Sequence, residues 1–392
     1  MLRVLGKGKT AQAIKDIYDD VSLYDDNDLD IYDNTSNDIT VVSPGIPPYN
    51  ELVKSTINQI SDYDLFLTSI YNKEQKEIFS IWISGTNGKT TTTQMCEHLL
   101  KDNNFIAAGN IGLPLAKAYN KNKNLILETS SFTLHYTSYA KPNIYVLLPI
   151  SADHISWHGN YKEYEQSKLK PIYSLNEGEI AIVPYKYKDI KTNGYLITYK
   201  DTNDLAVIFD IDLKRINFKE PFLMDSVIAL GIKKILFDVI DYNKINTFTQ
   251  DPHKLEEFYD KNNRLWVDDS KATNVDATIQ ALNTYKDNTI HIILGGDDKG
   301  ASLEELFILM SKLNINIYAI GANQNKIKEL SDQFSILCEL CDDIKTAVKQ
   351  IKSNFKVNNN EVAILSPAAA SLDQFSSYKQ RGEKFKENVQ IL

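Results

Sequence analysis

Cysteine and long apolar runs are scarce in this chain of 392 residues. It has 3 cysteines, Cys96, Cys338 and Cys341, which are too few for a disulfide framework and suit a reducing compartment. No apolar run approaches the length of a membrane span or of a signal peptide's core. We therefore expect a cytoplasmic protein with no membrane span.

A basic cluster is also absent. The formal net charge is −9, and no group of Lys and Arg residues forms a basic patch along the sequence. Because a nucleic-acid backbone requires such a face, we expect no nucleic-acid partner. Local cations would then have to bind any anionic substrate. The length allows two or three domains, each with its own core.

The spacing Cys338-Glu-Leu-Cys341 matches that of redox and zinc sites, but no second pair of ligands follows it. We favour a chance spacing.

A phosphate-binding loop is the strongest positive signal. Ser-Gly-Thr-Asn-Gly-Lys-Thr-Thr, residues 84–91, follows the strand-like run 78–83 and precedes a helix-like stretch that continues to Leu100. Glycines let backbone N–H groups turn toward phosphate oxygens, the helix adds its dipole, Lys89 reaches the β- and γ-phosphates and Thr90 holds Mg²⁺. The loop has two residues between its glycines where the common P-loop has four. The alternative is a glycine-rich turn that merely ends a strand. We predict an ATP site formed by Gly85, Thr86, Asn87, Gly88, Lys89, Thr90 and Thr91.

The alternation of short apolar runs with helical periodicity predicts an α/β protein of three domains, residues 1–75, 76–250 and 251–392. The polar stretch 248–253 marks the second boundary. The expected strands are residues 2–5, 40–42, 78–83, 125–127, 144–148, 180–183, 264–267, 289–294, 315–320 and 361–365.

The first domain has a glycine-rich turn, Gly6-Lys-Gly, after its first strand, but it lacks the third glycine of a dinucleotide-binding fingerprint. The loop Ser43–Pro48 follows the strand 40–42. Ligands bind at such carboxyl ends in open α/β sheets.

Two strand ends in the second domain carry candidate metal ligands. Glu128 ends the strand 125–127, at the sheet edge where the phosphate loop lies, and its carboxylate suits Mg²⁺. The plain alternative is a solvated strand-end residue. His154 follows the strand 144–148, and Lys168 comes fourteen residues later; taken alone, these would be a structural histidine and a solvated lysine.

The phosphate loop resembles the Gly-Thr-Asn-Gly-Lys-Thr-Thr signature of the Mur ligases and of their relative folylpolyglutamate synthase, which are ATP-dependent amide-forming enzymes. Further motifs resemble the C-terminal signatures of the Mur ligases that add D-glutamate. These are residues 251–256, 268–274, 295–299 and 366–375, followed by Arg381-Gly382.

This resemblance implies an N-terminal Rossmann-like uridine-nucleotide domain, a central P-loop ATPase domain with a mainly parallel sheet, and a C-terminal Rossmann-like domain that binds the amino acid. It implies ligation of D-glutamate to UDP-N-acetylmuramoyl-L-alanine through an acyl phosphate, in peptidoglycan precursor synthesis. The implied cofactors are ATP, two Mg²⁺ ions and CO₂ as a lysine carbamate. We expect a monomer.

The resemblance also implies roles for single residues. Lys89, His154 and Lys168 would be catalytic. Metal would be bound by Thr90, Glu128, His154 and Lys168 as its carbamate. Lys254 and Asp269 would bind ATP together with the phosphate loop. The substrates would be bound by Asp25, Ser43, Pro44, Gly45, Asn110, Lys271, Thr273, Lys299, Ser371 and Tyr378.

The chain departs from the family pattern in two segments. His253-Lys254 stands where the family commonly has His-Arg, so a single ammonium would replace a bidentate guanidinium. The asparagines that the family usually has near the adenine do not occur in residues 221–226.

Two alternatives remain open. One is another ligase of the superfamily, although the Asp-Asn-Pro-Arg-like motif of the diamino-acid ligase is absent. The other is a nucleotide-gated P-loop switch, which would not need Lys271, Thr273, Lys299 and Ser371.

Overall fold

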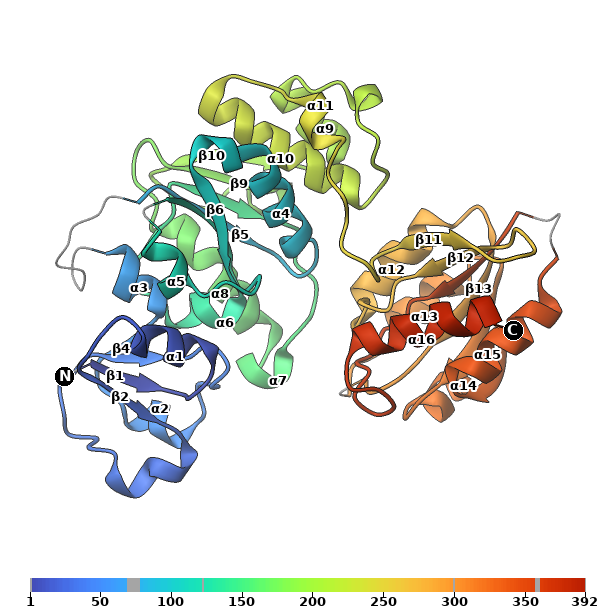
Figure 1. Cartoon of the computed structure of the whole chain (residues 1–392), viewed down its shortest axis with the longest axis horizontal. Helices are drawn as coiled ribbons and strands as arrows, with labels where there is room; N and C mark the ends of the chain where they lie inside the picture. The colour runs from blue at the N-terminus through green and yellow to red at the C-terminus, as the bar shows by residue number, and fades with distance from the viewer. Residues whose placement is uncertain (1, 69–77, 122, 299, 357–359, 392) are drawn as a thin grey trace. The chain divides into compact units, whose positions relative to one another are not determined.

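A computed structural model describes residues 2–68, 78–121, 123–298, 300–356 and 360–391. The chain divides into two compact units, Met1–Phe248 and Thr249–Leu392 (Figure 1). The first unit holds two sheets and the second holds one. The expected boundary at residue 75 lies outside the described residues, and the division into three domains stays a prediction.

The N-terminal sheet of the first unit is parallel, with the strand order β2-β1-β3-β4. Its strands are β1 (Leu2–Leu5), β2 (Val21–Tyr24), β3 (Thr40–Val42) and β4 (Gln59–Ile60). Its helices are α1 (Lys9–Lys15), the 3-10 helix η1 (Asp26–Ile31), α2 (Glu51–Ser55) and α3 (Asp62–Leu67).

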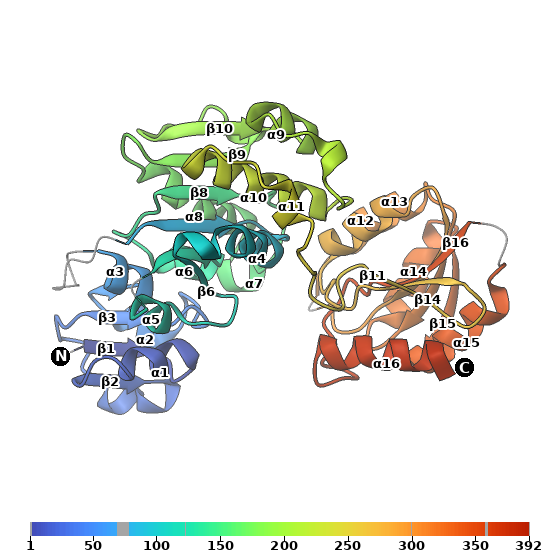
Figure 2. The same ribbon diagram turned by 45° about the horizontal axis from the view of Figure 1, so that its top comes forward.

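The central sheet has six parallel strands in the order β10-β9-β8-β5-β7-β6, and Figure 2 shows β8, β9 and β10 side by side. The strands are β5 (Ser80–Ser84), β6 (Phe105–Gly109), β7 (Asn124–Glu128), β8 (Ile144–Leu147), β9 (Ile180–Pro184) and β10 (Tyr195–Tyr199). The helices are α4 (Lys89–Leu100), α5 (Leu115–Tyr119), α6 (Ser131–Tyr136), α7 (Ile155–His158), α8 (Tyr161–Tyr173), α9 (Thr202–Phe209), α10 (Phe222–Phe237) and α11 (Tyr242–Ile245). The 3-10 helices η2 (Lys101–Asn103), η3 (Tyr185–Tyr187) and η4 (Leu213–Arg215) connect these elements.

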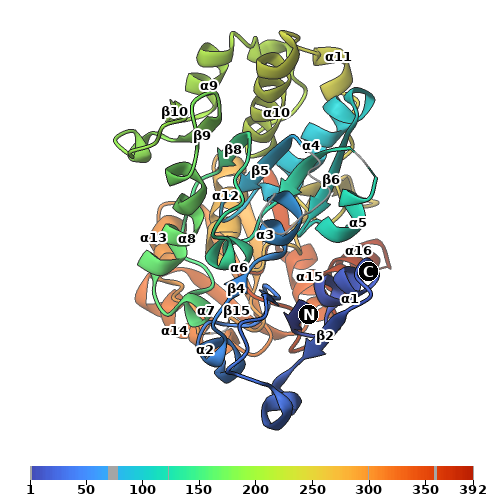
Figure 3. The same cartoon turned by 90° about the vertical axis from the view of Figure 1, so that its left-hand side faces the viewer.

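Helices cover both faces of the central sheet, so the side chains that point to either side of a strand are buried. In β5, Ile81 and Ile83 pack with α4, α9 and α10, whereas Trp82 packs with α5, α6 and α8. Figure 3 shows α4 beside β5 and β6. The cluster around Trp82 continues into the N-terminal sheet through Val4 and Val41, with α3 and α5 between the two sheets (Figure 1).

A buried carboxylate joins α3 to the segment that follows α6. Asp64, fully buried, accepts hydrogen bonds from the backbone N–H groups of Ser138 (2.9 Å), Tyr139 (2.7 Å) and Ala140 (2.7 Å). It also accepts from the N–H and hydroxyl groups of Ser61. Several charge-assisted bonds at one carboxylate offset the cost of burying its charge.

The second unit is a sheet in the order β11-β12-β16-β13-β14-β15, parallel except that β11 pairs antiparallel with β12. The strands are β11 (Glu256–Tyr259), β12 (Leu265–Asp268), β13 (Thr289–Leu294), β14 (Ile315–Ile320), β15 (Leu337–Asp342) and β16 (Glu361–Leu365). The helices are α12 (Val275–Thr284), α13 (Glu304–Met310), α14 (Gln324–Gln333), α15 (Ile344–Asn354) and α16 (Tyr378–Ile391). Side chains of α12, α13 and α14 pack on one face of the sheet, and those of α15 and α16 on the other (Figure 2).

The α/β fold class with mainly parallel sheets is confirmed.

Cys338 and Cys341 both lie in β15, where they pack against clusters on opposite faces of the sheet. Burial raises the pKa of Cys338, and it raises the pKa of Cys341 to about 12. Two thiols on opposite faces of a sheet are poorly placed to bind one metal ion together, which favours the chance spacing. Among the described residues, no helix is long and apolar enough to cross a membrane.

Replacing Asp64 with asparagine should destabilise the first unit. The amide has one acceptor oxygen, and its NH₂ group would face the N–H donors that the carboxylate accepts. Since hydrogen bonds to a charged group each contribute about 1.5–3 kcal/mol, we expect the Asp64→Asn variant to lose about 3 kcal/mol. Calorimetry of the full chain should show a lower melting temperature for this unit.

Asp62 supplies a matched control in the same helix. It is also buried, but its Oδ1 atom has no partner in the described part of the chain, and burial raises its pKa to about 7. The Asp62→Asn variant should therefore lose less stability near neutral pH. Equal losses in the two variants would contradict the role given to Asp64.

Candidate active site

The phosphate loop forms a tight turn at the junction of β5 and α4. Gly85 (φ 145°) and Gly88 (φ 82°) both have backbone conformations that side-chain-bearing residues rarely adopt. A Cβ atom on Gly85 would lie 2.5 Å from Leu148 Cβ, and one on Gly88 would lie 3.0 Å from Asp225 Oδ1. Gly88 also leaves the N-terminus of α4 without a side-chain cap. A helix that begins on glycine presents its first N–H groups and its positive dipole end to an anion.

Two lysines converge on one carbonyl of this loop. The ammonium of Lys89 donates to Gly85 O (3.0 Å) and Thr86 O (2.6 Å), and that of Lys168 donates to Gly85 O (2.8 Å). Lys168 reaches the loop from α8 and is 1 % exposed. Burial lowers the pKa of Lys168 well below its ordinary value, repulsion from Lys89 adds to the effect, and Asp153 opposes it. Burial therefore disfavours the charged form of Lys168.

Glu128 has the character of a metal ligand. It ends β7, is buried, and its Oε1 atom accepts a hydrogen bond from Asn110 Nδ2 (3.0 Å). Its Oε2 atom is buried and has no hydrogen-bond partner in the described part of the chain. A buried carboxylate oxygen without a partner is costly unless a cation or a donor fills the gap. Glu128 therefore fits Mg²⁺ binding, and Asn110 lies beside it.

His154 lies at the start of α7 in a left-handed conformation (φ 53°), with an exposed side chain 3.5 Å from Asp153 Oδ2. His158, at the other end of α7, is buried and shares a hydrogen bond with Ser131 Oγ (2.9 Å). Burial, aided by neighbouring cationic side chains, lowers the pKa of His158 to about 4. His158 therefore stays neutral near physiological pH.

Thr86 is held by the protein itself. Its N–H group donates to Pro149 O (3.1 Å), and its hydroxyl bonds both to Ser151 and to Tyr164 OH (2.8 Å). The ring of Tyr164 lies under the Lys168 ammonium at 4.9 Å. Thr86 thus fixes the loop to the end of β8 and to α8; its direct contact with ATP stays a prediction.

The expected uridine-nucleotide residues gather at the carboxyl edge of the N-terminal sheet. Asp25 follows β2 and caps η1, whereas Ser43, Pro44 and Gly45 follow β3. The hydroxyl of Ser43 is buried without a partner in the described residues. Lys7, which follows β1, forms ion pairs with Asp25 (3.1 Å) and Asp28 (2.7 Å).

In the second unit, a buried arginine fixes two loops at the carboxyl ends of β12 and β16. Arg381 donates to Ser270 Oγ (3.0 Å), Ser270 O (2.8 Å) and Ala369 O (3.0 Å). Burial lowers its pKa to about 10, so it stays charged. The loop after β13 joins them, because Asp297 and Ala370 exchange backbone hydrogen bonds.

These loops carry most of the expected amino-acid ligands. The Lys271 ammonium lies 5.7 Å from the centre of the Tyr378 ring, Thr273 follows in the same loop, and Ser371 is buried in the loop after β16. Lys299 lies outside the described residues. These roles stay predictions.

The two remaining ATP ligands predicted in this unit have protein partners. Lys254 lies 3.8 Å from Asp251. Asp269 is buried and accepts from Ser366 Oγ (2.7 Å), and burial raises its pKa to about 7.

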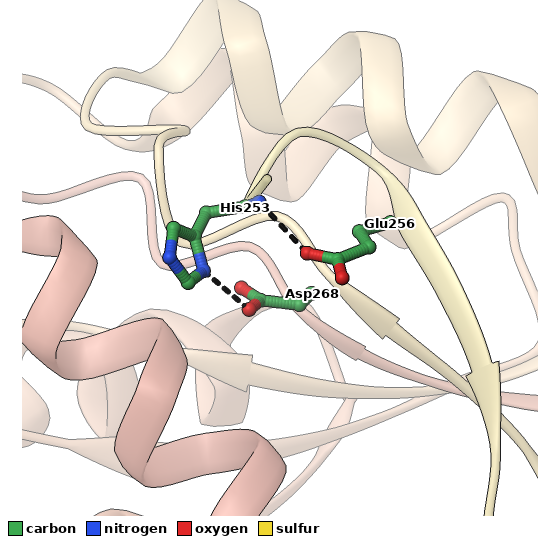
Figure 4. Close-up of side chains that lie close together, drawn as sticks. All are labelled: His253, Glu256 and Asp268. Carbon is green, nitrogen blue, oxygen red and sulfur yellow. Dashed lines mark hydrogen bonds and ion pairs between the residues drawn. The ribbon is translucent and has the colours of Figure 1, made fainter. Parts of the chain in front are cut away.

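His253, Glu256 and Asp268 lie close enough together to share a metal ion (Figure 4). Protein donors already occupy these atoms. His253 Nδ1 lies 2.6 Å from Asp268 Oδ2, the His253 N–H group donates to Glu256 Oε2 (3.0 Å), and the Lys386 ammonium is 3.0 Å from both Glu256 oxygens. We interpret this arrangement as a structural ion-pair network, in which Lys386 connects α16 to Glu256 at the start of β11.

Comparison with known proteins agrees with this geometry. Residues 83–218 match the Mur ligase middle domain. The chain is 46% identical over 406 residues to a UDP-N-acetylmuramoylalanine–D-glutamate ligase of Campylobacter jejuni, covering 99% of each chain. It is 40% identical over 424 residues to the ligase of the same name from Helicobacter pylori, again covering 99% of each chain.

The chain belongs to the Mur ligase family. Solved structures agree in fold: MurF from Thermotoga maritima in complex with ADP has a TM-score of 0.60 at 14% identity and covers 90% of this chain and 88% of its own. MurC from the same organism has a TM-score of 0.56 at 13% identity and covers 98% of each chain. The family resemblance drawn from the motifs is thereby confirmed.

Sequence reasoning gave no role to three residues that contact these sites: Lys7, His158 and Tyr164. It named His253 only as part of a family motif. The Gly-Lys-Gly turn could have indicated Lys7, and the i, i+4 spacing of Tyr164 and Lys168 on a helix could have indicated Tyr164. His158 had no signal of its own, since its partner Ser131 lies 27 residues away.

Replacing Gly382 with alanine tests the network around His253. In most helices this change is stabilising by about 1 kcal/mol. Here the new Cβ atom would lie 2.2 Å from His253 Nδ1 and 2.7 Å from Asp268 Oδ2, and overpacking costs about 1–3 kcal/mol. We expect a lower melting temperature for the second unit.

The exposed neighbour Glu383 provides the control, because Glu383→Ala in the same helix should leave the melting temperature nearly unchanged. A Gly382→Ala variant more stable than the wild type would show that α16 does not pack tightly on His253.

Proposed function

We propose that this chain is the ATP-dependent ligase that adds D-glutamate to UDP-N-acetylmuramoyl-L-alanine in peptidoglycan precursor synthesis. Identity of 46% to a relative of that name, over 99% of both chains, carries the proposal. The carboxylate of the acceptor takes the γ-phosphoryl group of ATP and becomes an acyl phosphate. The amine of D-glutamate then attacks the acyl carbon, and phosphate leaves.

Lys89 and the N-terminus of α4 would bind the β- and γ-phosphates. In the first step one anion attacks another, so positive charge at the γ-phosphate lowers the barrier. Lys89 lies against the carbonyls of Gly85 and Thr86, and phosphate oxygens would replace these carbonyls as acceptors.

Thr90, Glu128 and His154 would hold two Mg²⁺ ions. The unpartnered Oε2 atom of Glu128 supports this assignment. When bound, the metal supplies charge neutralisation between the two anions. The Thr90 hydroxyl and the Glu128 carboxylate contribute what Mg²⁺ prefers, a small number of oxygen ligands that leave room for phosphate and water. His154 would add a nitrogen ligand.

Lys168 would act as a carbamate. Its neutral amine attacks the carbon of CO₂, the new N–C bond forms, and one proton is released to water. The lowered pKa of Lys168 favours this step, because only the neutral amine has the lone pair. The product is an anion with two oxygen ligands in place of a cation.

In the second unit, Lys271 and Lys299 would bind the carboxylates of D-glutamate, and hydroxyl groups of Thr273 and Ser371 would orient it. Lys254 and Asp269 would contact ATP. The carboxyl edge of the N-terminal sheet, with Asp25, Ser43, Pro44 and Gly45, would bind the uridine nucleotide, and Asn110 its sugar-phosphate part.

Substrate choice is the first test. Phosphate release from ATP with UDP-N-acetylmuramoyl-L-alanine should require D-glutamate. L-Glutamate, L-lysine and meso-diaminopimelate are the controls, and equal release with any of them would overturn the amino-acid assignment. Release that ignores both substrates would instead favour a nucleotide-gated switch.

The carbamate has a separate test in Lys168→Ala. This variant should be nearly inactive, and acetate or formate should restore part of its turnover by taking the place of the carbamate oxygens. If Lys168 only forms an ion pair with phosphate, small amines should restore turnover of the variant instead. Rescue by amines and not by acids would therefore contradict the carbamate.

Lys170→Ala is the matched control, because Lys170 lies two residues away on α8 and donates to the backbone carbonyls of Leu134 and His135. Its turnover should not respond to acids. Carbon-13 NMR of wild type with labelled bicarbonate should show a carbamate signal that Lys168→Ala lacks.

A further inference from the structure

The position of His154 depends on a very short helix. His154 is the N-cap of α7, which has four residues, and its carbonyl accepts the N–H groups of Trp157 and His158, both at 3.1 Å. A helix of this length has almost no stability of its own. The His154 side chain is exposed, and so short a helix does not fix its position. Contacts with side chains from other segments must therefore determine where its imidazole lies.

His158 connects α7 to the segment that follows β7. Its Nε2 atom lies 2.9 Å from the hydroxyl oxygen of Ser131, and Ser131 comes three residues after Glu128. Both partners are buried. This hydrogen bond therefore joins the loop that carries His154 to the segment that carries Glu128.

Phe132 strengthens the same connection. Its ring stacks on His158 (centroids 5.7 Å apart, planes at 25°) and meets His154 edge-on at 4.7 Å. Trp157 packs against Phe132 at 4.5 Å and against His158 at 4.4 Å. The imidazole of His154 thus rests on a ring whose neighbour in the sequence, Ser131, is held by His158.

We propose that His158 is a positioning residue that sets the separation of Glu128 and His154. The inference rests on the proposed function, in which these two side chains bind Mg²⁺. Magnesium demands near-ideal octahedral geometry, and partners outside the ligand shell typically change metal affinity about 10–100-fold. His158 acts through its bond to Ser131 and touches no substrate.

Three substitutions separate the hydrogen bond from the shape of the ring. His158→Phe keeps a flat ring against Phe132 and removes the bond to Ser131. Ser131→Ala removes the bond from the other side. His158→Gln keeps a donor near the position of Nε2 and removes the aromatic ring.

Mn²⁺ provides a readout that does not depend on turnover. Binding of Mn²⁺ to the full chain is measured by electron paramagnetic resonance, with a non-hydrolysable ATP analogue and UDP-N-acetylmuramoyl-L-alanine present. His158→Phe and Ser131→Ala should each weaken the second Mn²⁺ about tenfold, with a matching rise in the Mg²⁺ concentration that gives half-maximal phosphate release. The double variant should be no weaker than either single one, and His158→Gln should stay close to wild type.

Wild-type binding of the second Mn²⁺ by His158→Phe would overturn the proposal, and so would a His158→Gln variant as weak as His158→Phe. If His158→Phe fails to fold, Ser131→Ala decides in its place. The His154→Ala variant tests the metal-binding role of His154 separately from the positioning role of His158. If the His154→Ala variant still binds both Mn²⁺ ions, the metal-binding role of His154 in the proposed function is wrong. If this variant loses one Mn²⁺ ion while His158→Phe binds both, only the role of His158 is wrong.

Discussion

The parallel pairing of β5 with β7 and β8 is the constraint on which the first unit's site depends. Parallel neighbours end at the same edge of a sheet, so the phosphate loop after β5, Glu128 at the end of β7 and the His154 loop after β8 come together although up to 70 residues separate them. Ligands bind at this edge in open α/β sheets for the same reason. Helix α8 then returns across the sheet and brings Lys168 to Gly85.

This edge brings two amine groups and a buried carboxylate into one site. Two lysines donate to one carbonyl, and one oxygen of Glu128 is buried without a partner among the described residues. Burial of the Lys168 amine and of a carboxylate oxygen without a partner costs free energy. Phosphate oxygens near Lys89, a cation near Glu128 and conversion of Lys168 to an anion would each reduce that cost. We infer that binding energy at this site comes largely from charges that the fold has already placed.

Many of the strands and the phosphate loop could be predicted from local sequence. The elements and residues that could not be predicted have a physical feature in common. The strands 289–294, 315–320 and 361–365 were predicted with the bounds that the structure shows, because fully buried parallel strands read as continuous apolar runs. The expected strand ranges do not include β2, β4, β6, β10, β11 and β15. All six lie at the edge of a sheet, where short or interrupted apolar runs carry a weaker signal. The phosphate loop was found because one contiguous motif encodes it. His158 was not found, because its role depends on contacts with Ser131 and Phe132 that only the tertiary structure creates.

In the second unit, a single buried side chain connects the loops that carry the expected ligands. The loops after β12 and β16 have little regular structure, and Arg381 donates from three nitrogens to atoms of both. A lysine has a single nitrogen and could not span the same acceptors. Because the guanidinium is buried and planar, it fixes the two loops relative to each other as well as to α16. Lys271 and Ser371 belong to these two loops, so we infer that Arg381 holds in place the residues that we propose to bind D-glutamate.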